Sequence, residues 1–164
     1  MLKEIYQSLG ISCQIFLVGD GSGSLAKDPC GWYTGVYYPE TDEEGCFYGA
    51  FSTGTNNCAE LMPYVQALSS HWALKRPERQ TIIISDSLIT VNCGNRKNSR
   101  SANLPLWAAM DCIVAHGYNI QWIHMPRNSN GAMRHADEFS KEIREVLQHG
   151  YIPGNLRSRV AMRK

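Results

Sequence analysis

The stretch TIIISD, residues 81–86, is a short, almost wholly apolar segment that ends in a carboxylate. Runs of β-branched residues of this length are typical of a strand that is buried on both faces of a sheet. Such a strand lies in the middle of its sheet, with helices packed on either side. The stretch therefore predicts an α/β domain whose central strand ends at Asp86.

The rest of the chain supplies further strands and helices around this central strand. Before it we expect strands over 14–20, 31–39 and 45–52, the last two joined as a hairpin by an acidic loop that contains Gly45, and then a helix over 58–74. After it we expect a short helix over 87–93, a helix over 104–117 that stops at Gly117, a strand over 118–125 and an amphipathic helix over 133–150 that ends at Gly150. This order predicts that residues 81–86 lead through a crossover into a parallel neighbour.

Composition places the chain among ordinary globular proteins. Its 164 residues suit one domain, and its 43% hydrophobic and 19% charged residues exclude disorder of the whole chain. No apolar run is long enough to span a membrane, and the first ten residues do not resemble a signal peptide. Six scattered cysteines without a CxxC pair indicate reduced, mostly buried thiols. We therefore expect a cytoplasmic protein that acts as a monomer and has no membrane partner.

Charge is divided unevenly along the chain although the net charge is only +1. Residues 1–70 have a net charge of −6 and residues 71–164 one of +7, with basic clusters at 94–101 and 155–164. Solvated loops account for such clusters as well as a polyanionic partner does. The charge pattern alone is therefore weak support for binding nucleic acid.

Four carboxylates fall where predicted strands end or helices begin: Asp20, Glu60, Asp86 and Asp137. Three of them also have a local explanation: Asp20 suits a turn, Asp86 suits an N-cap, and Asp137 would interact favourably with the dipole at the start of its helix. Two parallel neighbouring strands that both end in carboxylates would nevertheless bring like charges together. Divalent cations such as Mg²⁺, which bind carboxylate oxygens and phosphates, would remove that repulsion.

Glu60 lies in the stretch TNNCAEL, residues 55–61, which has two interpretations of its own. With Asn57 as N-cap and Glu60 three residues later, the stretch is a close variant of a capping box. Glu60 can equally be a ligand that holds a metal ion. The two interpretations do not exclude one another.

Taken together, DGSG…DPCGWYTGV, TNNCAEL, ISDS and HADEFSKEI resemble, in order, the signature blocks of the type 1 ribonuclease H family over about residues 12–148. The resemblance implies a five-stranded mixed sheet flanked by helices, with residues 1–11 as an N-terminal extension, 12–150 as the catalytic domain and 151–164 as a basic tail. It implies cleavage of the RNA strand of RNA–DNA hybrids with two Mg²⁺ ions, for which Mn²⁺ is a substitute, leaving 5′-phosphate and 3′-hydroxyl ends. By position, Asp20, Glu60, Asp86 and Asp137 are the catalytic metal ligands.

The same resemblance names the substrate contacts. Asn57 corresponds to a minor-groove contact, with Asn56 beside it, and Thr55 to a contact with a DNA phosphate. The remaining expected contacts are Gly21, Ser22, Ser87, Arg96, Lys97, Arg100, Arg127 and Asn130.

The chain departs from the family pattern in two places. The short segment GNRKNSRSANLP leaves no room for the basic protrusion of some members, so the chain resembles the compact forms. Many members also place a mobile His before the last helix, and here Arg127, Asn128, His124 and His135 compete for that position. The PRxxN stretch at 126–130 is similar to ribonuclease H-like domains associated with reverse transcriptases, so a reverse transcriptase or the replication machinery is an expected partner.

Two other functions compete with hybrid cleavage. One is a nucleic-acid-binding module of the same fold with weakened catalysis, which the altered loop before Asp137 would suit. The other is a DNA-processing relative such as a resolvase or integrase, which has no reason to keep the TNNxxEL pattern. A shared fold cannot separate the three, because function depends on the site.

Overall fold

The computed structural model describes residues 1–23, 28–54 and 56–149. Five helices are present in these ranges: α1 (Leu2–Ser8), α2 (Asn56–Ala73), α3 (Leu88–Gly94), α4 (Leu104–Ala115) and α5 (Gly131–His149). The strands are β1 (Ile15–Ser22), β2 (Asp28–Tyr38), β3 (Glu43–Gly54), β4 (Gln80–Ser85) and β5 (Asn119–His124). The predicted α/β class is confirmed. The C-terminal boundary at Gly150 and the basic tail lie outside the described residues.

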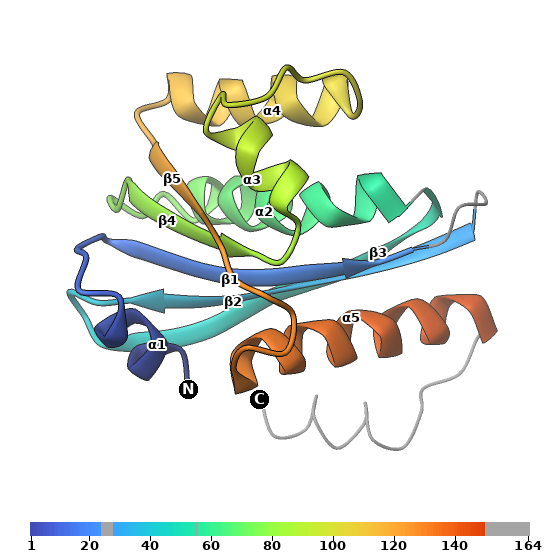
Figure 1. Ribbon diagram of the computed structural model, residues 1–164, viewed down its shortest axis with the longest axis horizontal. Helices are drawn as coiled ribbons and strands as arrows, with labels where there is room; N and C mark the ends of the chain where they lie inside the picture. Colours follow the sequence, from blue (N-terminus) through green and yellow to red (C-terminus); the bar gives the residue numbers. More distant parts are fainter. Residues whose placement is uncertain (24–27, 55, 150–164) are drawn as a thin grey trace.

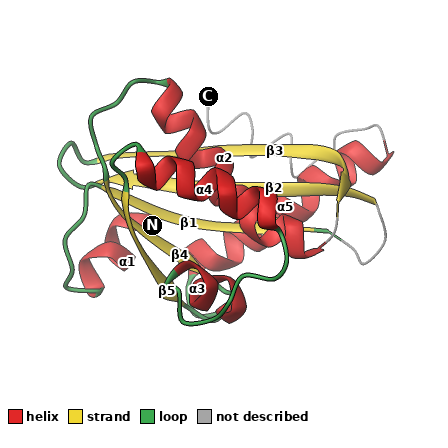
Figure 2. Cartoon of the chain, turned by 90° about the horizontal axis from the view of Figure 1, so that it is seen from above, coloured by secondary structure: helices red, strands yellow, loops and turns green. Residues whose placement is uncertain are grey.

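The five strands form one mixed sheet in the order β3-β2-β1-β4-β5 (Figure 2). β1 pairs antiparallel with β2 and parallel with β4, and β4 pairs parallel with β5. The stretch TIIIS thus lies between two parallel neighbours, and every residue from Thr81 to Ser85 is buried, as expected for a strand covered on both faces. The predicted central strand and the parallel crossover after it are both confirmed.

Helices cover both faces of the sheet. α2 and α4 lie on one face, and α1 and α5 lie on the other (Figure 1). Alternation along β1 builds a core on each side: Leu17 joins a cluster with residues of α2 and α4, whereas Phe16 and Val18 join a cluster with residues of α1 and α5. The sheet therefore holds its side chains between two helical layers, and its strand ends form the rim on which a site can be built.

The N-terminal helix and the hairpin turn differ from the prediction. No helix was expected before β1, but α1 forms and inserts Leu2, which is 5% exposed, into the α5-side core. Gly45 was expected in the hairpin loop, but β3 already begins at Glu43 and Gly45 pairs with Val36. Asp42 makes the turn with φ 54°, and the Tyr37 hydroxyl donates a hydrogen bond to its carboxylate. Asp is among the residues that tolerate this left-handed conformation.

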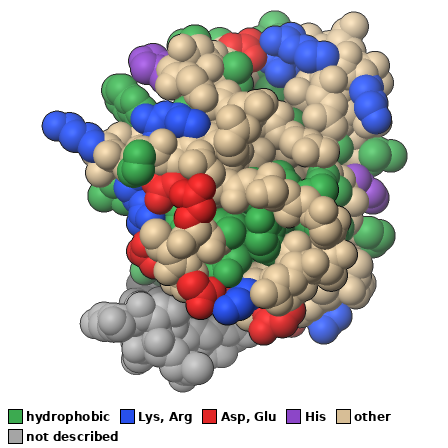
Figure 3. Space-filling model, turned by 90° about the vertical axis from the view of Figure 1, so that its left-hand side faces the viewer, with side chains coloured by type: hydrophobic (Ala, Val, Ile, Leu, Met, Phe, Trp, Pro, Cys, Tyr) green, Lys and Arg blue, Asp and Glu red, His purple; other side chains and the backbone are tan. Residues whose placement is uncertain are grey.

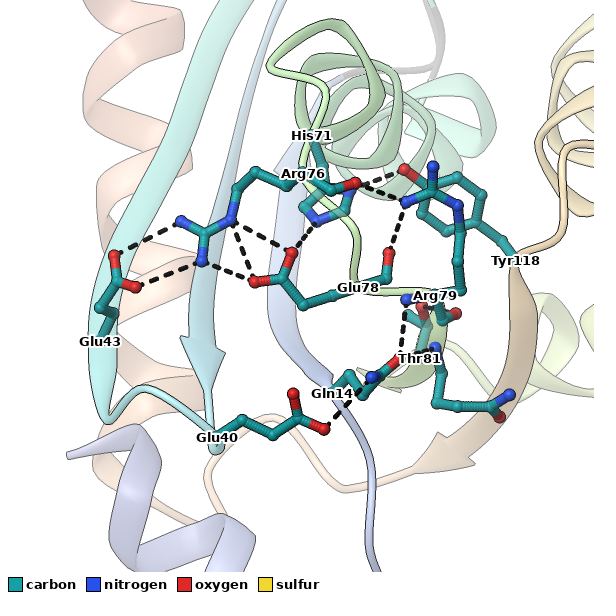
Figure 4. Close-up of polar contacts among 10 residues, drawn as sticks. Gln14, Glu40, Glu43, His71, Arg76, Glu78, Arg79, Thr81 and Tyr118 are labelled. Atoms are coloured by element: carbon teal, nitrogen blue, oxygen red, sulfur yellow. Dashed lines mark hydrogen bonds and ion pairs between the residues drawn. The ribbon is translucent and has the colours of Figure 1, made fainter.

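A buried polar network joins the end of α2 to the amino ends of β4 and β5 (Figure 4). His71, 1% exposed, lies with Nδ1 2.6 Å from the Tyr118 hydroxyl and Nε2 3.4 Å from Glu78. Arg76 pairs with Glu78 at 2.7 Å and with Glu43 at 3.2 Å. Burial lowers the pKa of His71, so the network is built around a neutral imidazole.

The cysteines match the compositional analysis in part, because all the thiols are free but only half of them are buried. Acidic and basic side chains are interspersed on the end of the molecule that carries the β2–β3 turn (Figure 3). All six cysteines are free thiols, and three of them, Cys13, Cys30 and Cys93, are buried. None of the helices in the described part of the chain is long and apolar enough to cross a membrane.

Candidate active site

Three of the four candidate carboxylates come from β1, the end of β4 and α5. Parallel pairing of β1 with β4 ends at Val18 and Ile84, two residues before Asp20 and Asp86 respectively. The carboxyl ends of these strands meet at one edge of the sheet, and α5 packs against β1 and carries Asp137. The sequence prediction that Asp20 and Asp86 face a shared edge is consistent with this register.

Asp20 is the most unusual of these groups. Its side chain is 4% exposed, its Oδ1 accepts a hydrogen bond from the Gly21 amide at 2.9 Å, and its Oδ2 is buried with no hydrogen-bond partner among the described residues. Burial, and then the nearby charge of Asp86, raises the pKa of Asp20 to about 8. The fold therefore holds a carboxylate oxygen that lacks a protein donor in a place where negative charge is costly.

Arg127 supplies positive charge at this edge. Its Nε lies 2.8 Å from an Asp86 carboxylate oxygen and 3.7 Å from one of Asp137. His124 lies beside the same residue, with Nε2 3.2 Å from the Asp86 carbonyl, whereas the His135 ring packs edge-on against Tyr33. Among the four residues that compete for the position of the mobile His, Arg127 pairs with two of the candidate carboxylates, Asp86 and Asp137.

Glu60 is held by the residue that begins the next helix. The Ser87 hydroxyl donates to Glu60 Oε2 at 3.2 Å, and Ser87 is also the N-cap of α3, where its side chain accepts from the Thr90 amide. The interpretation of Asp86 as the N-cap is therefore wrong. α2 begins at Asn56, so Asn57 lies inside the helix and not at its cap position. Burial raises the pKa of Glu60 as well.

The donor chemistry of this edge suits a divalent cation, although the side chains are not arranged as a closed metal site. Carboxylate oxygens are the ligands that Mg²⁺ prefers, and the buried, partnerless Oδ2 of Asp20 is such an oxygen. Within the described ranges, however, no three His, Cys, Asp or Glu side chains are grouped closely enough to hold an ion. In this structure Arg127 neutralises Asp86 and Asp137, and Lys141 also pairs with Asp137 at 2.9 Å.

Comparison with known proteins connects this architecture to one family. No family model matches the chain. A ribonuclease H of Verminephrobacter eiseniae is 29% identical over 122 residues, which cover 66% of this chain and 76% of that protein. The N-terminal ribonuclease H domain of a Mycobacterium tuberculosis protein superposes with a TM-score of 0.71 at 18% identity, over 85% of this chain and 99% of that one. The chain is therefore similar in sequence to a ribonuclease H and shares the fold of ribonuclease H domains.

Two further solved structures are similar to this chain. LC11-RNase H1, solved in complex with an RNA/DNA hybrid, has a TM-score of 0.67 at 20% identity over 80% of this chain and 96% of its own. A prototype foamy virus protease–reverse transcriptase has a TM-score of 0.60 at 14% identity, and the chain covers 21% of it. Residues 95–103 connect α3 directly to α4 with no helix between them, as the short segment in the sequence predicted.

Several of the expected substrate contacts have a local structural role. Gly21 and Ser22 are buried at the end of β1, and a Cβ on Gly21 would lie 1.6 Å from the Ala59 carbonyl oxygen. Glycine is thus needed where β1 meets the first turns of α2. Asn130 is placed at the start of α5, where its side chain accepts from the Met133 amide at 2.8 Å.

The expected basic contacts are also partly engaged in pairs within the protein. Arg100 lies over the Trp107 ring at 4.2 Å and pairs with Asp111 at 2.8 Å, and its side chain is only 10% exposed. Arg96 pairs with the same Asp111 at 3.2 Å. Lys97 is exposed. Thr55 and the side chains of Asn56 and Asn57 lie outside the described residues.

Proposed function

We propose that the protein is an endoribonuclease that hydrolyses the RNA strand of RNA–DNA hybrids with two divalent metal ions, Mg²⁺ or in its place Mn²⁺. The products would be 5′-phosphate and 3′-hydroxyl ends. The observation that carries the proposal is the buried Asp20 carboxylate, with a partnerless oxygen, beside Asp86 and Asp137 at one sheet edge. Similarity to ribonuclease H proteins, one of them solved in complex with an RNA/DNA hybrid, supports this choice of substrate.

The metal ions would be held by Asp20, Glu60, Asp86 and Asp137. When bound, they supply an activated water and charge stabilisation at the departing oxygen. The protein's own groups orient the ligands: the Gly21 amide fixes one oxygen of Asp20 and leaves the other free, and the Ser87 hydroxyl holds Glu60. Arg127 neutralises Asp86 and Asp137, so it competes with a cation for the same carboxylates.

Hybrid recognition is proposed to rest on the start of α2 and on the loop after α3. Amides at Asn56 and Asn57 suit the minor groove, where RNA displays its 2′-hydroxyls, and Thr55 suits a DNA phosphate. Asn57→Ala should weaken cleavage of hybrids at low substrate concentration. Asn57→Asp should lose more activity, because a carboxylate repels phosphate. Equal activity of Asn57→Asp and the wild type would remove Asn57 from the interface.

A single assay tests the proposed reaction. An RNA–DNA hybrid labelled on either strand is incubated with the protein beside double-stranded RNA and double-stranded DNA, in Mg²⁺ or in EDTA. The proposal expects cleavage of only the RNA strand of the hybrid, and only in Mg²⁺. Cleavage of the DNA strand of the hybrid, or of the double-stranded DNA, would favour a DNA-processing relative instead.

A second candidate function is a nucleic-acid-binding module with weakened catalysis. It is favoured by the pairing of Arg127 with Asp86 and Asp137 and by the lack of a closed metal group in the described residues. Binding of the hybrid without cleavage at any Mg²⁺ concentration would support this candidate. A reverse transcriptase remains a proposed partner for either function, on the likeness to the foamy virus enzyme.

A further inference from the structure

Tyr64 lies one helical turn after Glu60 on α2 and is fully buried. Its hydroxyl oxygen lies 2.8 Å from the Gly19 carbonyl oxygen and 2.9 Å from the Ile84 carbonyl oxygen. The single hydroxyl proton is thus shared between carbonyls of two different strands, β1 and β4. A buried tyrosine needs a hydrogen-bond partner, but one strand would be enough to satisfy it.

The Tyr64 hydroxyl bridges β1 and β4 close to the candidate carboxylates. The parallel pairing of β1 with β4 ends at Val18 and Ile84. At that point the Tyr64 hydroxyl connects Gly19, directly before Asp20, to Ile84, two residues before Asp86. The bridge therefore spans the two strands where the ladder stops and the carboxylates begin.

The surroundings of the ring fix the hydroxyl in this place. A Cβ on Gly19 would lie 3.0 Å from Cε1 of Tyr64, so the glycine gives the ring room to lie against β1. On its other side the ring meets Trp122 of β5 edge-to-face, with centroids 5.5 Å apart. Packing from β1 and β5 leaves the hydroxyl little freedom to turn away from the two carbonyls.

We propose that Tyr64 is a positioning residue for the metal site, whose hydroxyl sets the spacing of β1 and β4 and hence of the Asp20 and Asp86 carboxylates. The inference rests on the proposed function, because it assigns the two carboxylates to one metal site. Carboxylates on adjacent strand ends repel one another when both are ionised, as they are when they hold a cation, and the hydroxyl opposes the separation of those strands. Groups that orient metal ligands change metal affinity without touching the ion.

The test compares Tyr64→Phe with the matched control Tyr118→Phe. Each variant removes one buried tyrosine hydroxyl, but Tyr118 bonds His71 at the amino end of β5, away from the carboxylates. Mg²⁺ affinity is measured by titration calorimetry on the free protein, and Tm is measured in EDTA. Steady-state cleavage of the hybrid gives kcat and KM.

We expect Tyr64→Phe to bind Mg²⁺ about tenfold more weakly and to lose kcat, with KM for the hybrid little changed. Tyr118→Phe should lower Tm to a similar extent and keep the Mg²⁺ affinity of the wild type. Suppose that the wild type cleaves the hybrid, and that Tyr64→Phe has a lower Tm but the same Mg²⁺ affinity as the wild type. Tyr64 is then only a core residue, and this inference fails while the proposed function stands. If the wild type binds no Mg²⁺, the proposed function fails and this inference fails with it.

Discussion

Replacing Asp20 by Asn should stabilise the metal-free protein. With a pKa of about 8 in the folded protein and 3.8 as the reference value, the unfolded chain ionises Asp20 between these pH values while the folded protein retains the proton. Stability therefore falls as pH rises through this window. Linkage gives a cost of roughly 2 kcal/mol at pH 5 and about 4 kcal/mol at pH 7.

Part of this gain is offset in the variant. An Asn side chain at this position can keep the hydrogen bond from the Gly21 amide, but its amide group is then buried where Asp20 Oδ2 has no partner. Such a group costs about 1–3 kcal/mol. We therefore expect a net stabilisation of about 1–3 kcal/mol at pH 7, which raises Tm by several degrees for a domain of this size.

The assay is thermal or urea unfolding in EDTA from pH 5 to pH 8. The advantage of Asp20→Asn over the wild type should grow with pH, and Mg²⁺ should reduce it because the cation binds only the intact site. Asp111→Asn is the matched control, since it removes an exposed carboxylate that is paired with Arg96 and Arg100 and should give no gain. A variant that is less stable than the wild type at pH 7, or a difference independent of pH, would refute the reasoning.

Four further predictions concern single charged or titratable side chains. Arg127→Ala should lower Tm in EDTA and tighten Mg²⁺ binding measured by calorimetry, because the guanidinium competes for the carboxylates; weaker binding would contradict this. Arg100→Ala should cost about 1–3 kcal/mol in urea unfolding through lost contacts with Trp107. Lys97→Ala should leave stability unchanged and lower the log–log salt slope of hybrid binding by about 0.9; an unchanged slope would exclude a phosphate contact. Because the pKa of His71 is lowered from 6.5, the free energy of unfolding should decrease as pH falls below 6.5, and His71→Gln should remove this decrease.

The sheet was largely predictable because its signals are local. A β-branched run such as TIIIS has one common structural outcome, and Gly117, with φ 98°, ends α4 as expected. α1 was not predicted because seven residues are too few to form a stable helix by propensity alone, and this helix depends on burying Leu2 against β2. Gly45 was misplaced because glycine favours turns, while Asp42 takes the left-handed turn position.

The candidate site residues could be named from the sequence, but their contacts could not. Element ends and family resemblance name Asp20, Glu60, Asp86 and Asp137, because strand and helix termini can be read along the chain. Contacts between residues that are distant in the sequence cannot be read along the chain, so the contact of Arg127 with two carboxylates was found only in the structure. Tyr64 gave no sequence signal beyond an apolar position of a helix, since nothing local shows that its hydroxyl reaches two strands.

The central claim is that the carboxylates at this edge form a catalytic metal centre. The most direct measurement is cleavage of an RNA–DNA hybrid, labelled on its RNA strand, by the wild type and by Asp86→Asn across a Mg²⁺ titration. The account predicts Mg²⁺-dependent products with 5′-phosphate and 3′-hydroxyl ends for the wild type, and none for a folded Asp86→Asn variant. Near-normal cleavage by Asp86→Asn, or cleavage by the wild type in EDTA, would contradict it.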